Sequence, residues 1–120
     1  MAQSKIKKIV NYPVNSYNCQ VIINGKSFIK LEVSQYYKTK LGRSSVSDEV
    51  IQELVKKLPN RPLRRNQNDY YNFEPLYIDY RAYNLVWDYE EEEFTNTLLI
   101  IDCYREKKFD LKQSHVKKNY

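Results

Sequence analysis

Tyrosines next to cationic residues are the side chains of this sequence that could do chemistry. Tyr104 precedes Arg105 at the end of one apolar segment, and Arg81 lies two residues before Tyr83 at the start of another. Three more cations follow a pair of tyrosines earlier in the chain: Lys38, Lys40 and Arg43. Cleavage of RNA without a metal ion requires little more, because the 2′-hydroxyl of the RNA is itself the nucleophile. Arginine or lysine then stabilises the charge that develops on the phosphate, and tyrosine, histidine or glutamate transfers protons.

Other catalytic classes have no matching motif. No serine or cysteine nucleophile motif is present, and the isolated Gly25 and Gly42 cannot build a phosphate-binding loop. Cys19 and Cys103 lie in apolar segments without CxxC spacing, which favours reduced core thiols over a zinc or redox site. The single histidine, His115, lies in a lysine-rich tail, where we expect an exposed side chain. We therefore predict no metal and no cofactor, with a site of carboxylates alone left open.

The charge is unevenly distributed along the chain. Of the 120 residues, 20 are Lys or Arg and 15 are Asp or Glu, which gives a net charge of +5 and a pI of about 9.1. Asp88 and residues 90–93 supply five negative charges, so the rest of the chain carries +10. Such a surface attracts polyanions, because phosphate contacts release condensed counterions, although an ordinary solvated surface accounts for the same numbers. The cations predicted to contact nucleic acid are Arg43, Arg61, Arg64, Arg65, Arg81, Lys107 and Lys108.

Tyrosine is the outlier of the composition, with 12 residues. Tyrosine rings close to cations can stack on nucleic-acid bases. Tyrosines such as Tyr77 and Tyr83 also suit a half-buried strand, so we expect most strand tyrosines to pack within the fold.

The first half of the chain predicts a hairpin followed by helices. Residues 19–24 and 26–33 are β-rich and flank Asn24-Gly25, the pair that a type I′ turn prefers. A short helix is predicted over residues 34–40, with Gly42 as its C-cap. Residues 47–58 predict an amphipathic helix, since Ser47 can cap it and its apolar residues recur at helical spacing.

The second half predicts three strands, at residues 74–80, 83–89 and 97–105. The last two should form an antiparallel hairpin, with Tyr83, Leu85, Trp87 and Tyr89 on one face. The fold class is therefore α+β, an antiparallel sheet of about four to five strands with two helices on one face. We expect one domain over residues 1–120, with a basic segment at 1–18, a core at 19–107 and a basic tail at 108–120. No apolar run approaches a membrane span and no secretory signal is readable, so we expect no membrane partner and a cytoplasmic location.

Two stretches carry a resemblance to a known family: VIINGKSFIKLEVSQYYKTKLGRSSVSDEVIQELVKKL and AYNLVWDYEEEEFTNTLLIIDCYREK. They resemble small bacterial ribonuclease toxins of the RelE-type and barnase-like group, in which a helix pair precedes a Tyr-x-Leu-Val-Trp strand, an acidic turn and a strand that ends in Tyr-Arg. The resemblance implies helices on one face of a small sheet, RNA cleavage on the other, a possible association with ribosomes, and neutralisation by a cognate antitoxin. The residues that match as catalytic are Tyr37, Lys40, Tyr104 and Arg105. Asn84 and Tyr36 depart from the family pattern, where a basic residue and a histidine are expected.

Three functional hypotheses follow. The first is an RNA-binding, toxin-like protein, a metal-independent endoribonuclease in which Arg105 and Lys40 contact phosphate and Tyr104 or Tyr37 assists proton transfer. The second is a non-enzymatic interaction domain that uses the acidic hairpin or a sheet edge. The third is a mimic of nucleic acid built on the acidic run, which the net positive charge disfavours.

Overall fold

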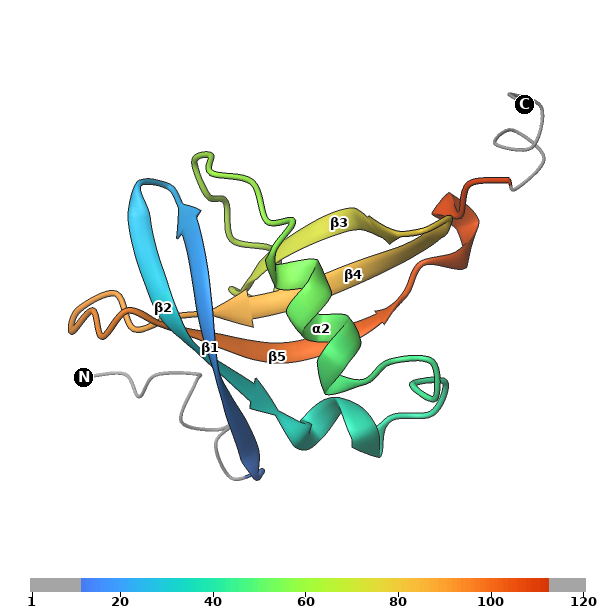
Figure 1. Ribbon diagram of the computed structural model, residues 1–120, viewed down its shortest axis with the longest axis horizontal. Coiled ribbons are helices and arrows are strands. Elements are labelled where there is room, and N and C mark those ends of the chain that lie inside the picture. Colours follow the sequence, from blue (N-terminus) through green and yellow to red (C-terminus); the bar gives the residue numbers. More distant parts are fainter. Residues whose placement is uncertain (1–11, 113–120) are drawn as a thin grey trace.

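The computed structural model describes residues 12–112 (Figure 1). In chain order its strands and helices are β1 (Val14–Ile23), β2 (Lys26–Ser34), the 3-10 helix η1 (Gln35–Thr39), α2 (Asp48–Val55), β3 (Tyr71–Ile78), β4 (Arg81–Asp88), β5 (Thr97–Arg105) and the 3-10 helix η2 (Lys107–Phe109). All five strands belong to one sheet with the spatial order β1-β2-β5-β4-β3. β1 begins at Val14, so part of the predicted N-terminal segment belongs to the first strand.

The sheet is mixed, whereas the sequence predicted an antiparallel one. β2 and β5 run parallel, from the pair Lys30↔Thr97 to the pair Val33↔Ile100, and the other three pairings are antiparallel. The long connection from β2 through α2 leads to β3 at the far edge of the sheet, and the antiparallel succession of β3, β4 and β5 then places β5 beside β2 in the same direction. The coarser α+β assignment holds for the described residues, because the strands pair mostly antiparallel and α2 packs on one face of the sheet.

The prediction of two α-helices is wrong, since α2 is the one α-helix within residues 12–112. The segment after β2 forms a single 3-10 turn, in which Ser34 Oγ accepts from the N–H of Tyr36 and Lys40 N–H donates to the carbonyl of Tyr37. Gly42 has a φ of +79° but does not cap this turn, because the capping position is Lys40.

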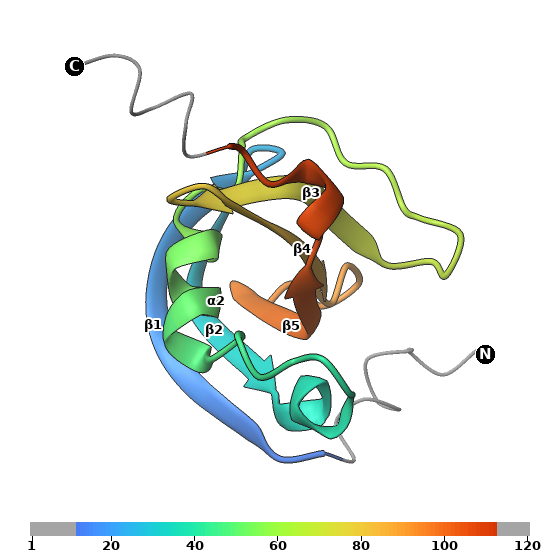
Figure 2. The same cartoon turned by 90° about the vertical axis from the view of Figure 1, so that its right-hand side faces the viewer.

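α2 begins as its sequence predicts. Ser47 is the N-cap, and its Oγ accepts from the N–H of Val50 at 3.2 Å. Ile51, Leu54 and Val55 are buried against the sheet, which curves around the helix in the end-on view of Figure 2. The helix ends at Val55, and single turns continue the chain to Leu58.

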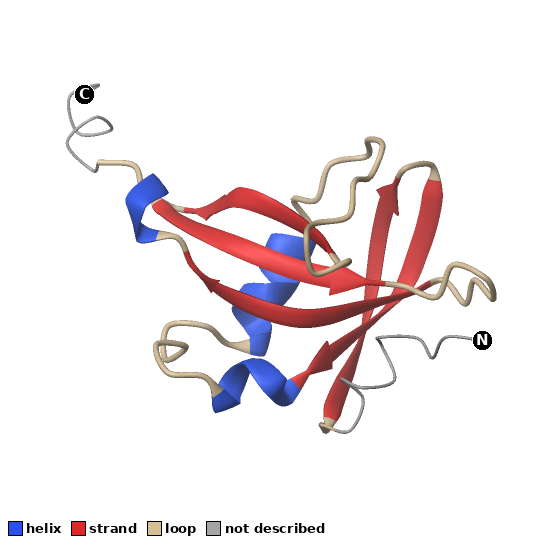
Figure 3. Cartoon of the chain, turned by 180° about the vertical axis from the view of Figure 1, so that it is seen from behind, coloured by secondary structure: helices blue, strands red, loops and turns tan. Residues whose placement is uncertain are grey.

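The predicted hairpins are confirmed. Asn24 and Gly25 have φ values of 51° and 74°, the two positive angles of a type I′ turn. β4 and β5 pair antiparallel, and Leu85, Trp87 and Cys103 are buried on the side of α2. The opposite side of β3, β4 and β5 faces the viewer in Figure 3. Within the described part of the chain, no helix is long and apolar enough to cross a membrane.

Candidate functional site

A polar cleft of about 650 Å³ lies on the face of the sheet opposite α2. We call it the outer-face cleft. Strands β3, β4 and β5 form its floor, and residues 66–70 and Tyr36 of η1 complete its walls. Its lining is rich in amides, hydroxyls and carboxylates: Tyr36, Asn66, Gln67, Asn68, Tyr70, Asn72, Glu74, Asn84, Val86, Ile101, Asp102 and Tyr104.

The pleat of β4 and β5 directs polar side chains to this face. Asn84 alternates with the buried Tyr83 and Leu85, and its register partner on β5 is Tyr104. A bulge follows, because Val86 pairs with Asp102 while the next residue of β4 pairs with Ile100. The extra residue shifts the alternation, so that two consecutive side chains of β5, Ile101 and Asp102, both line the cleft.

Amide side chains form a hydrogen-bonded chain across the floor. Asn66 Nδ2 donates to Asn72 Oδ1 at 3.3 Å, and Asn72 Nδ2 donates to Asn84 Oδ1 at 3.4 Å. Asn84 Nδ2 then donates to Glu74 Oε2 at 2.9 Å and to the hydroxyl of Tyr104 at 3.1 Å. Asn84 is 4% exposed, so these bonds fix its amide and, through it, the Glu74 carboxylate and the Tyr104 hydroxyl.

The wall at residues 66–70 is held by Asn66. Its Oδ1 accepts from the backbone N–H groups of Asn68 and Tyr70 at 2.9 and 3.1 Å, and its own N–H donates to the Tyr70 carbonyl. An isolated β-bridge between Arg65 and Tyr71 joins this loop to β3. The loop is thereby positioned beside the strands that form the floor.

Two cations lie at one end of the outer-face cleft. The Arg43 guanidinium binds Asp102 through Nε at 3.3 Å and Nη2 at 3.0 Å, and it lies over the Tyr104 ring at 4.7 Å from the centroid. Lys40 Nζ is 4.9 Å from the centroid of the Tyr36 ring. Hydrogen bonding with Tyr36 raises the pKa of Lys40, and the Asp102 charge acts in the same direction, so this lysine is charged at neutral pH.

Burial is the largest cause that raises the pKa of Tyr104, and the carboxylates of Glu106, Glu74 and Asp102 raise it further, against the opposing effect of Arg43. Its hydroxyl therefore keeps its proton at neutral pH. The arrangement offers aromatic faces for stacking, amide and carboxylate groups for hydrogen bonding, a protonated hydroxyl and positive charge at one end.

Two of the four predicted catalytic residues lie at this site. Tyr104 lines the cleft and Lys40 lies against Tyr36, which lines it too. Arg105 follows Tyr104 on the same strand, and consecutive strand residues face opposite ways. It donates through Nε to the Ala82 carbonyl at 3.3 Å, forms an ion pair with Asp110, and lies over the Tyr83 ring. The structure therefore does not bring Arg105 together with Lys40 and Tyr104.

Tyr37 lies away from the outer-face cleft. It is fully buried, and its hydroxyl donates to Asp48 Oδ1 at 2.6 Å. Asp48 Oδ2 also accepts from the Tyr17 hydroxyl at 2.6 Å and from Asn15 Nδ2 at 2.7 Å, and Gln35 Nε2 approaches both oxygens at 3.4 Å. We call these five residues the Asp48 cluster. Burial and then the bond to Asp48 raise the pKa of Tyr37 far above its usual value.

The cations predicted to contact nucleic acid do not form one patch. Arg43 lies at the outer-face cleft, as described above. Arg65 pairs with Asp88 and Glu91 and lies over the Tyr71 ring at 4.2 Å, and Arg61 lies over the Phe73 ring at 4.8 Å. The others are exposed at three separate places, in the loop before β3, at the start of β4 and in η2: Arg64, Arg81, Lys107 and Lys108.

The acidic run is partly neutralised within the protein. Asp88 is 5% exposed and accepts from Arg65, and Glu91 accepts from Arg65 and from the Tyr71 hydroxyl. Glu92 and Glu93 are exposed at the turn. Only part of this run is therefore available to a partner.

Sequence reasoning missed the asparagines of the outer-face cleft and the carboxylate of the Asp48 cluster. The signal that could have found the wall is the run Asn66-Gln67-Asn68, whose three consecutive amides suit polar binding. No group of three or more His, Cys, Asp or Glu suited to a metal ion occurs among the described residues. His115 and most of the predicted basic tail lie outside the described residues.

Comparisons of this chain with protein-family models, with curated proteins and with solved structures find no match. The resemblance to RelE-type and barnase-like toxins therefore stays a prediction, and the function is argued from the site alone.

Proposed function

We propose that this protein binds single-stranded RNA in the outer-face cleft. The observation that carries the proposal is the conjunction of three tyrosines, a chain of amides and two cations around one open concave surface. Bases would face the floor, and phosphates would lie toward Lys40 and Arg43.

Each type of side chain in the cleft has a counterpart in unpaired RNA. Aromatic rings stack on exposed bases, which is the usual means by which proteins hold single-stranded RNA. Asparagine amides match the donor and acceptor edges of bases, and a carboxylate such as Glu74 accepts from an exocyclic amino group. Glu74 repels phosphate from the middle of the floor, whereas the Asp102 charge is met by Arg43, so the phosphates are assigned to the cationic end. Arg43 lies over the Tyr104 ring there, and the Tyr104 hydroxyl shares the Asn84 amide with Glu74, so a phosphate at this end would border both groups.

The more specific part of the proposal is that the protein cleaves the RNA it binds. Glu74 and Arg43 take the places of Tyr37 and Arg105 among the catalytic residues, and Tyr104 and Lys40 are kept. Glu74 would take the proton of the RNA 2′-hydroxyl, whose oxygen then forms a bond to phosphorus. The bond from phosphorus to the 5′-oxygen breaks, and that oxygen takes the proton of Tyr104. Tyr104 and Glu74 suit these roles because both bond to the same Asn84 amide. Lys40 and Arg43 would stabilise the charge on the phosphorane.

Binding is tested by fluorescence anisotropy with fluorescein-labelled ten-nucleotide RNAs of A, C, G or U. Tyr104→Ala removes a stacking ring and is expected to weaken binding about tenfold. Tyr77→Ala is the matched control, because Tyr77 is a half-buried strand tyrosine outside the cleft whose hydroxyl donates to the Phe109 carbonyl. Equal affinities for the two variants, or no RNA binding by the wild type at 50 mM salt, would contradict the proposal.

Cleavage is tested separately with Tyr104→Phe, which keeps the ring and loses the proton. The wild-type protein should release products that end in a 2′,3′-cyclic phosphate, in buffer containing a chelator. The variant should bind RNA within about twofold of the wild type and cleave at least about 100-fold more slowly. Binding without cleavage by the wild type would leave an RNA-binding protein and reject the nuclease.

The toxin-type assignment and its cognate antitoxin belong to the same proposal. Induced expression in a bacterial host should arrest growth, and the Tyr104→Phe variant should not. Normal growth with intact RNA under wild-type expression would reject this part.

A further inference from the structure

Strand β1 is an edge strand without the usual protection against pairing. It is ten residues long and contains no charged residue and no proline. Its described backbone bonds within the sheet go to β2, which leaves the outer row of N–H and C=O groups open. Natural edge strands are generally blunted by charges, proline, shortness, a covering segment or a bulge. β1 has only a bulge between Asn18 and Val21.

The opposite edge of the same sheet is protected. β3 contains Pro75, which has no N–H to donate to an added strand. The loop before it forms the bridge between Arg65 and Tyr71 at the start of the strand. The contrast shows that the open edge at β1 is not a general property of this sheet.

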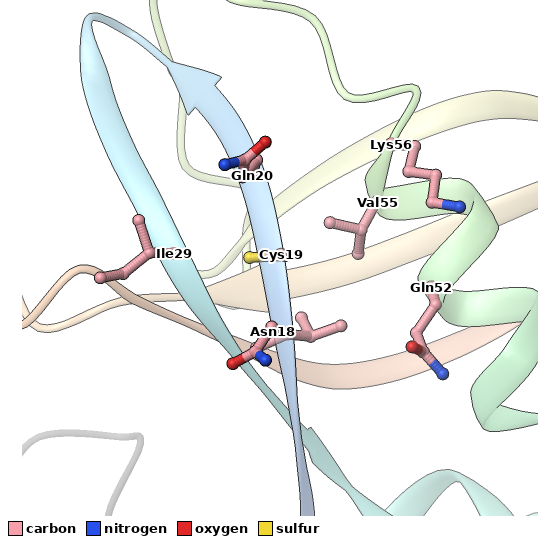
Figure 4. Close-up of a pocket in the computed structure, with 8 residues that line it drawn as sticks. Asn18, Cys19, Gln20, Ile29, Gln52, Val55 and Lys56 are labelled. Carbon is pink, nitrogen blue, oxygen red and sulfur yellow. The ribbon is translucent and has the colours of Figure 1, made fainter.

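A groove of about 690 Å³ lies between β1 and the C-terminal half of α2. In Figure 4, Gln52, Val55 and Lys56 of α2 stand across from the strand that carries Asn18 and Cys19. Leu31 of β2 is part of the floor, and together with Val55 and Cys19 it gives the groove an apolar centre. Lys56 is the charged residue among those that line it. It is exposed, and its Nζ forms a solvent-exposed ion pair with Glu53 Oε1 at 3.1 Å, a weak contact for which an acidic side chain of a partner can compete.

We propose that an extended segment of a partner protein pairs with β1 and lies in this groove against α2. A row of backbone donors and acceptors is matched by another extended backbone, which is the mode of β-strand addition. The apolar centre selects an apolar side chain at the middle of the segment, and Lys56 selects an acidic side chain toward the end of α2. A second copy of β1 fits less well, because it contains no carboxylate to meet Lys56.

The probe is a phage-displayed library of random decapeptides, selected on the intact 120-residue protein. The selected peptides should alternate apolar and polar residues and carry an acidic residue at a constant position. One of them, synthesised with a fluorescein label, should slow amide hydrogen exchange in residues 15–22 while leaving β3 unchanged.

Two pairs of variants locate the peptide. Lys56→Glu should weaken its binding at least about fivefold, and Lys57→Glu, which changes an exposed neighbour outside the groove lining, should not. Gln52→Trp should block binding by filling the groove, whereas Glu49→Trp on the first turn of α2 should not. Circular dichroism and urea unfolding of each variant separate lost binding from lost folding.

Three outcomes would overturn the proposal. These are the absence of any selected peptide, a bound peptide that protects no amide of β1, and equal effects of Lys56→Glu and Lys57→Glu. A concentration-dependent dimer that protects the same amides without peptide would assign the edge to a second copy instead. None of these measurements involves RNA, so they fail or succeed independently of the proposed function.

Discussion

The Asp48 cluster and the outer-face cleft are built from the same residue types, tyrosines, amides and a carboxylate, in opposite surroundings. In the first, Asp48 is 6% exposed and accepts from two tyrosine hydroxyls and two amides. In the second, the tyrosines and amides border an open cleft.

The difference lies in whether a ligand can still reach the polar groups, since those of both sites have hydrogen-bond partners within the protein. The donors of the Asp48 cluster come from β1 and η1 and end on one carboxylate at the start of α2, so the cluster joins these three elements. In the outer-face cleft a ligand can still reach the tyrosine rings and the amides at the wall. Tyr37 therefore has a structural role, and Tyr104 remains a candidate for chemistry.

Asp48→Asn gives the largest effect expected from this comparison. The amide cannot accept from four donors, so the buried Tyr37 hydroxyl competes with the half-buried Tyr17 hydroxyl for one acceptor, and the free energy of unfolding should fall by about 3 kcal/mol. Urea unfolding monitored by circular dichroism measures this. Asp102→Asn in the outer-face cleft should cost less than about 1 kcal/mol, because it removes a partly solvated ion pair. Similar losses in the free energy of unfolding for Asp48→Asn and Asp102→Asn would contradict the distinction between a structural cluster and an open cleft.

Tyr37→Phe and Tyr104→Phe remove one hydroxyl from each site. Tyr37→Phe should lower the free energy of unfolding by about 2 kcal/mol, since the lost bond is to a buried charge. Tyr104→Phe should change it by less than about 0.5 kcal/mol, because solvent reaches that hydroxyl through the cleft. Chemical denaturation of both variants in parallel compares the two losses in the free energy of unfolding. A larger loss for Tyr104→Phe would assign the structural role to Tyr104 instead of Tyr37.

Acid should affect the Asp48 cluster in a defined direction. Burial alone would raise the pKa of Asp48, but hydrogen bonds from Asn15, Tyr17, Tyr37 and Gln35 outweigh it and hold the pKa below the usual value. A carboxyl with a lowered native pKa stabilises the fold above its unfolded pKa, near 4, and this contribution is lost as pH falls through the native value. The wild type should lose up to about 1.4 kcal/mol per pH unit more than Asp48→Asn below about pH 4. If the free energy of unfolding falls equally steeply with pH in the two proteins, the pKa of Asp48 is not lowered in the native state.

Arg43→Gln is expected to change stability only slightly. The pair with Asp102 is partly exposed, so the free energy of unfolding should change by less than about 1 kcal/mol and the change should shrink in high salt. RNA affinity measured by anisotropy should fall, and its dependence on salt should become less steep. Arg81→Gln, at an exposed arginine that begins β4 outside the cleft lining, is the control.

Local rules predicted much of the fold because they depend on neighbours in the sequence. Asn24-Gly25 prefers positive φ at both positions whatever surrounds it, and Ser47 caps α2 through an N–H three residues away. Alternation likewise placed Leu85 and Trp87 on one face of β4, and both side chains are buried. The 3-10 turn at η1 was misjudged because helical propensity over five residues is too weak to decide between helix types.

The candidate site was predictable only in part, because local rules do not reach contacts between segments that are distant in the sequence. Tyr104 was found because a tyrosine beside a cation at a strand end is visible in the sequence, but Arg105 was included with it although adjacent strand residues face opposite ways. Glu74 was not identified, and Asn84 was noted only as a departure from the family pattern, since their roles depend on strands β3 and β4 meeting at a particular register. The bulge that turns Asp102 into the cleft is also a property of the pairing.

The sequence by itself determined the turns, the helix start and the apolar faces, which are set by interactions among residues close along the chain. Only the tertiary structure decided that β5 lies parallel to β2, that Tyr37 donates to a buried carboxylate, and that Tyr104 opens into a cleft. These features join segments that are distant in sequence. They are fixed by the packing of the whole sheet around α2, where a residue's partners, rather than its type, determine whether it stabilises the fold or remains available for chemistry.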